Sequence, residues 1–163
     1  MKKILIIFFI FFFQFNFAIA NTKIAFIDMN KVISTSKPGS SMLSQLNDIN
    51  KTNLNKFKNE TKKLKEKESK LILQKNILSE TDFQNNIKKL KLEIDNYNVS
   101  RDKINNNFNK LRIDSTNELL KLINPILINY SNEKLISIIF KKKDLVIGMT
   151  ELDITDEIIK IMN

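Results

Sequence analysis

The 163-residue chain contains no histidine, no cysteine and no tryptophan, and only two glycines and two prolines. Without histidine or cysteine it lacks the usual zinc ligands, a thiol nucleophile and an imidazole general base. Disulfide bonds are excluded too, and so few glycines leave no glycine-rich phosphate loop. The acidic residues are spread along predicted helices among basic neighbours. We therefore expect no catalytic residue, no metal site and no cofactor site.

An apolar segment opens the chain. Two lysines precede the unbroken apolar run of residues 4–13, and Ala18-Ile19-Ala20 has the small-x-small pattern of a cleavage site. We predict a secretory signal peptide at residues 1–20, cleaved after Ala20. The alternative is an uncleaved anchor, but polar residues interrupt the segment, which falls short of the ~20 apolar residues that a spanning helix needs.

The remaining 143 residues suit a single domain, residues 21–163. They keep 25 of the 27 Lys and Arg and all 18 Asp and Glu, a net charge of +7. A basic exported protein can meet acidic unfolded chains or an anionic membrane surface, and we expect no nucleic-acid partner. Lysine, asparagine and isoleucine are abundant throughout, as an AT-biased coding sequence would produce, so the charge is a modest indicator.

Short apolar strands are predicted at both ends of this domain. The first is residues 23–28, followed by a helical turn that Asp28 can cap. The others lie within residues 135–154, as strands at 135–140 and 145–149 with pairing extended through 152–154, and a terminal helix follows at 156–162. These strands must meet to bury their apolar faces, so they predict a small β body. Its core candidates are Ile24, Phe26, Ile136, Ile138, Phe140, Val146 and Ile147.

Between the strands, about residues 40–130 are predicted to form a helical hairpin. Residues 40–78 contain no Gly or Pro and are rich in helix formers. Ser79 can cap a second helix, and from Phe83 onward apolar residues alternate at spacings of four and three over more than five heptads, as in a coiled-coil seam. Pro125 is expected to interrupt this helix, and Asn132 to end it in a left-handed conformation. The predicted seam is Phe57, Leu64, Leu71, Phe83, Ile87, Leu90, Ile94, Tyr97, Ile104, Phe108 and Leu111.

A compact bundle is the alternative arrangement for these helices. Bundle helices usually carry about three apolar positions in seven, whereas two in seven is the pattern here, which favours a slender two-helix arm. The predicted fold is thus mainly α with a small β body, in which a long antiparallel hairpin, a coiled-coil arm, projects from a short-stranded β-sheet or barrel. So small a body, without metal or disulfide, needs partner chains, so the sheet is also the predicted oligomerisation core.

The first arm helix is strongly basic. Its lysines could attract an acidic partner. For each lysine taken singly, a place on the solvated face of the arm is at least as good an interpretation. The candidates are Lys56, Lys58, Lys62, Lys63, Lys65, Lys67 and Lys70.

Three segments resemble the Skp/OmpH family of periplasmic chaperones. They are Lys23–Met29 (KIAFIDM), the hairpin tip Leu78-Ser79-Glu80 and, most specifically, Leu152–Lys160 (LDITDEIIK). The resemblance covers essentially all of residues 21–163. It departs from the family at Lys141–Asp144, which lacks the usual turn residues, and at Gly148-Met149, where an aromatic-containing stretch is expected.

The resemblance implies a periplasmic, non-enzymatic homotrimer. Its strands would form a central body, and its arms would enclose a cavity that holds unfolded outer-membrane β-barrel proteins without ATP. Two other functions fit the residues alone: a coiled-coil adaptor that docks another envelope protein, or a peripheral protein that places its lysines on anionic lipid.

Overall fold

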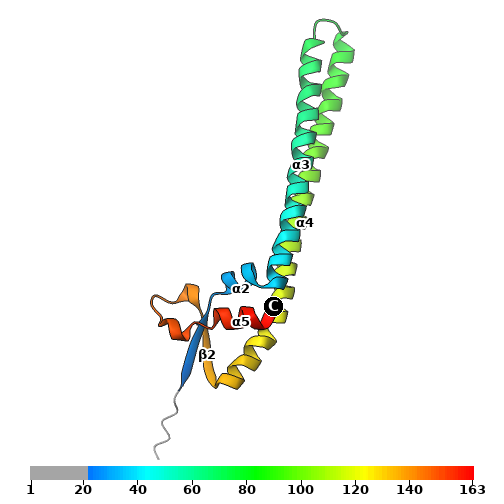
Figure 1. The fold of residues 1–163 in the computed structure, drawn as a ribbon. Helices are drawn as coiled ribbons and strands as arrows, with labels where there is room; N and C mark the ends of the chain where they lie inside the picture. Colours follow the sequence, from blue (N-terminus) through cyan, green and yellow to red (C-terminus); the bar gives the residue numbers. More distant parts are fainter. Residues whose placement is uncertain (1–21) are drawn as a thin grey trace, which may run out of the picture.

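The computed structural model describes residues 22–163, so the predicted signal peptide at residues 1–20 lies outside the described residues. Figure 1 shows a small body at one end and two helices that extend from it side by side as a long arm. The elements are β1 (Lys23–Ile27), α2 (Met29–Thr35), α3 (Lys37–Leu73), α4 (Glu80–Lys134), β2 (Ile136–Lys141), η1 (Lys142–Asp144), η2 (Thr150–Leu152) and α5 (Thr155–Met162).

The arm consists of α3 and most of α4, 37 and 55 residues long. Serines begin both helices: the Ser36 hydroxyl accepts from the Gly39 amide at 3.3 Å, and the Ser79 hydroxyl accepts from the Asp82 amide at 3.2 Å. The predicted cap at Ser79 is therefore confirmed. Helix α3 ends at Leu73, earlier than predicted, and a hydrogen-bonded turn over residues 74–78 makes the reversal.

Helix α4 continues through Pro125, contrary to the expected interruption. Its yellow to gold end turns away from the arm and runs beside the body (Figure 1), so the helix changes direction without ending. Proline removes one amide donor and favours such a bend. The left-handed residue that ends α4 is Leu135, at φ 55°, and not Asn132, because the helix runs two residues further before the chain reverses into β2.

The sheet contains two strands, β1 and β2, which run parallel with Ala25 opposite Ile139 and Phe26 opposite Phe140. Parallel neighbours need a long crossover, and here the whole helical arm is that crossover. Among residues 22–163 a single bridge, between Phe26 and Asp153, extends the sheet on the other edge of β1. A barrel is not closed within residues 22–163.

The predicted third strand at residues 145–149 is wrong for the single chain. The 3₁₀ turn η1 redirects the backbone after β2, and residues 145–149 form no strand. Val146 and Ile147 are fully exposed, at 104% and 91%. Within residues 22–163 this segment pairs with no strand.

The core lies where β1, α2, α4 and α5 meet. Its buried residues are Ala25, Ile27, Val32, Leu119, Ile123, Ile154, Ile158 and Ile159. Of the predicted body-core residues, Phe26 is buried, Ile136 is half-buried and packs against this cluster, and Ile24, Ile138 and Phe140 are exposed on the single chain. Sequence alternation did not identify the buried set because α4 and α5, and not a third strand, cover β1.

Candidate functional site

The C-terminal segment Asp153–Asp156 joins the ends of the domain through hydrogen bonds. Thr155 is 2% exposed, and its hydroxyl accepts from the Asp28 amide at 2.9 Å and donates to the Asp153 carboxylate. The Ile154 amide donates to the Phe26 carbonyl at 3.0 Å. Asp28 in turn caps α2 by accepting from the Lys31 amide at 3.0 Å, as predicted. The most specific sequence motif of the chain thus holds β1 and the start of α2 in place, and we call the segment Asp153–Asp156 with these hydrogen bonds the clasp.

Lys142 and Asp153 form an ion pair at the edge of this clasp, with 2.8 Å between Nζ and Oδ2. Partial burial acts to raise the pKa of Asp153, but hydrogen bonds from Lys142 and Thr155 outweigh it and hold that pKa below its ordinary value. The same hydrogen bond and the Asp153 charge raise the pKa of Lys142.

Acid is expected to weaken the clasp. Because the pKa of Asp153 is lower in the folded chain than in the unfolded one, its stabilisation is complete above the unfolded pKa of about 3.9 and is lost as the pH falls through the folded value. The urea midpoint of the wild type should therefore fall between pH 5 and pH 2 more steeply than that of Asp153→Asn. Equal slopes for the two proteins would show that Asp153 contributes nothing to acid unfolding.

A groove of about 700 Å³ runs beside β2. Consecutive residues of β2 line it together with α2 and α4, so it follows the strand edge that has no partner among the described residues. Its apolar walls include Ile33, Leu120, Leu127, Ile136 and Ile138. An open strand edge above apolar walls is a ready pairing surface for another chain.

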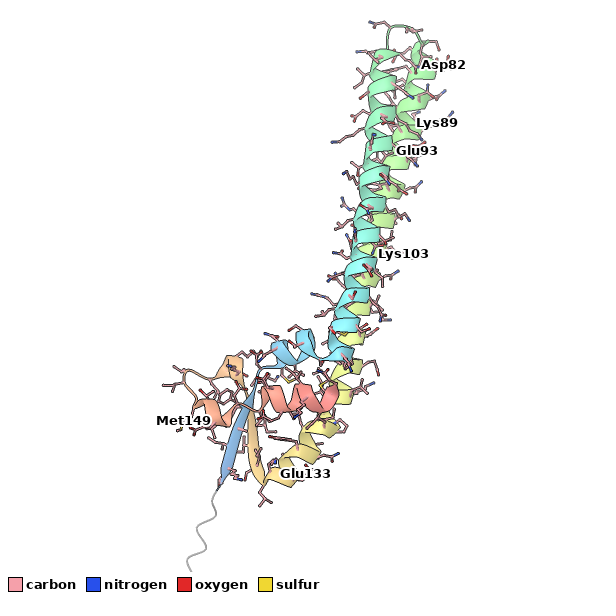
Figure 2. The ribbon with its side chains drawn as sticks, viewed as in Figure 1. Asp82, Lys89, Glu93, Lys103, Glu133 and Met149 are labelled. Atoms are coloured by element: carbon pink, nitrogen blue, oxygen red, sulfur yellow. The ribbon has the colours of Figure 1, made fainter. Side chains whose placement is uncertain are left out.

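The segment 145–149 projects from the body, with Leu145 half-buried and residues 146–149 exposed. Figure 2 shows Met149 on the side of the body away from the arm. Gly148 fits here because it lies on the ring of Phe26, where an added Cβ would come within 2.7 Å of the ring. A bulkier residue at 148 would push this segment off Phe26, which explains why glycine occupies the position.

The predicted seam residues lie along the contact between α3 and α4. Most are half-buried, and Ile87, Ile94 and Leu111 are 37–40% exposed, as expected where only two helices share a seam. Two polar contacts fix the register: Thr61 and Tyr97 hydroxyls lie 2.9 Å apart, and Lys67 Nζ lies 2.6 Å from Glu93 Oε2. The arm is therefore narrow and leaves most of its surface to solvent.

The seven basic candidates separate into two groups. Lys58, Lys62, Lys65 and Lys70 line one shallow groove of about 800 Å³ along α3, between Phe57 and Leu73. Lys67 instead pairs with Glu93 across the seam, and Lys56 and Lys63 lie outside the groove. Glu66 also lines this groove, with Oε1 3.9 Å from Lys62 Nζ, but the four lysines leave the groove positively charged, which suits an acidic partner. Lys67 instead stabilises the arm itself.

The described residues contain no cluster of three or more His, Cys, Asp or Glu side chains that could hold a metal ion. None of the helices in residues 22–163 is long and apolar enough to cross a membrane.

Comparison with known proteins identifies a family and a solved structure with the same architecture. A model of the family described as outer membrane protein (OmpH-like) matches residues 23–162. The chain belongs to this OmpH-like family. A crystal structure of a candidate outer membrane chaperone (OmpH-like) from Caulobacter crescentus CB15 is similar in fold, with a TM-score of 0.72 and 12% sequence identity over 88% of this chain and 85% of that one. No curated protein matches the sequence.

The family assignment confirms the resemblance inferred from the sequence, and the shared fold confirms the helical arm on a small β body. The functional candidates of this OmpH-like chain are thus three surfaces: the open groove beside β2, the exposed segment 145–149, and the solvent-facing sides of the arm.

Proposed function

We propose that this OmpH-like chain is a periplasmic, ATP-independent holding chaperone. It binds unfolded outer-membrane β-barrel proteins in a cavity between helical arms and prevents their aggregation, without catalysing a reaction. The observation that carries this proposal is the arm: two helices of 37 and 55 residues that extend far from the body with only a narrow seam between them. Such a surface suits enclosure of a partner better than a compact fold.

A homotrimer supplies the enclosure. The groove beside β2 and the exposed segment 145–149 are complementary, since one offers an open strand edge with apolar walls and the other offers extended apolar chain. Pairing between neighbouring subunits would give Val146 and Ile147 the burial that the single chain does not provide. A closed ring of three subunits leaves no open edge and sets three arms around one space.

To hold an unfolded client, the arms must attract it and make many weak contacts with it. The basic groove of α3 attracts acidic segments of an unfolded chain at long range, and exposed apolar side chains of the arm contact its apolar segments. Without ATP, release follows when the client gains more free energy by folding into a membrane than it loses by leaving the arms.

An aggregation assay tests the function. When a β-barrel protein is diluted from urea, about one trimer per client should suppress light scattering, and the protection should weaken in 1 M salt because the Debye length falls to about 3 Å. An adaptor would leave the unfolded chains to aggregate, and a lipid-binding protein would sediment with anionic vesicles in the absence of client. Undiminished scattering in the presence of a stable trimer would contradict the proposal.

A further inference from the structure

The side of α4 that faces away from α3 carries a row of apolar residues. Leu92, Val99 and Ile113 are exposed by 63%, 69% and 56%. They are separated by seven and fourteen residues, and seven residues make almost two full turns, so all three lie on one side of the helix. Asn106 occupies the missing position of this row.

The row points away from the seam. Leu92 and Val99 each lie two residues after a seam residue, Leu90 and Tyr97, and two residues rotate the helix by about 200°. The seam therefore does not require these side chains. On α3 the corresponding positions after Phe57, Leu64 and Leu71 are Asn59, Glu66 and Leu73. Only Leu73, at the tip of the arm, is apolar and exposed there, against three of four positions on α4.

We propose that Leu92, Val99 and Ile113 form the line on which an extended apolar segment of an unfolded client lies. This inference rests on the proposed function and assigns the contact residues within it. From Leu92 to Ile113 the helix rises about 32 Å at 1.5 Å per residue, a length that about ten residues of extended chain cover at 3.3 Å each. Ten residues is the length of one transmembrane β-strand.

Two other occupants fit this row less well. A helix of a second copy needs two apolar positions in seven, and the row offers one, interrupted at Asn106. Three separated side chains are also far below the ~800 Å² per partner of a stable interface. Beside the row, Asp95 and Asp102 lie among basic residues such as Lys103 and Lys110, so the local charge is mixed and does not favour an anionic membrane.

Affinity measurements on folded variants test the line. The triple variant Leu92→Asn/Val99→Asn/Ile113→Asn should raise the dissociation constant for a labelled β-barrel protein diluted from urea by about tenfold. Asn106 already shows that asparagine is compatible with this row of the helix. The matched control is Leu54→Asn/Ile72→Asn/Ile77→Asn, which removes apolar side chains exposed by 57%, 64% and 80% on α3 and the adjoining turn. An equal loss of affinity in both variants would overturn the line in favour of general apolar contact.

Photo-crosslinking separates this inference from the proposed function. A photoreactive residue at position 99 should crosslink to the client at least fivefold more than one at position 59, which lies on the opposite side of the arm and outside the basic groove of α3. Equal crosslinking from both positions, with aggregation still suppressed, overturns the line and leaves the chaperone proposal standing. No crosslinking from either position and no suppression overturns both.

Discussion

Replacing Ile123 with alanine is expected to reduce the free energy of unfolding by about 3–4 kcal/mol. Ile123 is 0% exposed and lies on α4 where the arm enters the body, within the cluster that also holds Val32 and Ile158. A core of so few residues has little capacity to refill the space left by the side chain. Urea unfolding followed by circular dichroism measures the loss.

Leu92→Ala is the matched control for this substitution. Leu92 lies on the same helix but is 63% exposed, so its truncation should change the unfolding free energy by less than about 0.5 kcal/mol. Similar losses at the two positions would mean that α4 unfolds as one uniform helix and that the body core does not govern stability.

The helical arm was predictable because its signals are local. Three signals predicted it: the heptad spacing, the absence of Gly and Pro over residues 40–78, and the cap at Ser79. Each acts within a few residues, and the structure has the two helices and the Ser79 cap that they predict. Helix ends were less accurate: Leu135, and not Asn132, adopts the left-handed conformation. That position depends on where β2 begins, which local preference does not encode.

The body was less predictable because its contacts join residues far apart in the sequence. Thr155 is buried because its hydroxyl satisfies the amide of Asp28, 127 residues away. Ile154 and Ile158 are buried because α5 packs near β1 and α2, while the equally apolar Val146 and Ile147 remain exposed. Alternation identifies apolar residues but not which of them find a neighbour within the same chain.

The exposed residues 146–149 are candidates for the contact between subunits. The failed prediction of a third strand arose from a pattern with strong β propensity, and the exposed apolar side chains of Val146 and Ile147 are a candidate contact surface for another subunit. In the proposed trimer the third strand forms between subunits, where the open edge of β2 provides the partner that the single chain lacks. In that assembly the strand predicted at residues 145–149 would exist, with its partner strand in a neighbouring subunit.

Ile147→Asp should therefore dissociate the trimer without unfolding the arm. The side chain is 91% exposed on the single chain, so a charge there costs nothing in the isolated subunit, whereas an unpaired carboxylate buried between subunits is strongly unfavourable. Analytical ultracentrifugation should show the subunit dissociation constant rising by about a hundredfold or more, equivalent to about 2.7 kcal/mol. Helical circular dichroism should be retained, and protection of unfolded β-barrel proteins should be lost with the trimer.

Val99→Asp is the control for this last substitution, since Val99 is 69% exposed but lies on the arm, away from the groove and from segment 145–149. It should sediment as the wild type does. A trimer that survives Ile147→Asp would place the subunit contact elsewhere on the body, and the exposed segment would then need a different partner. Loss of the trimer in both variants would instead indicate that added negative charge disrupts assembly regardless of position.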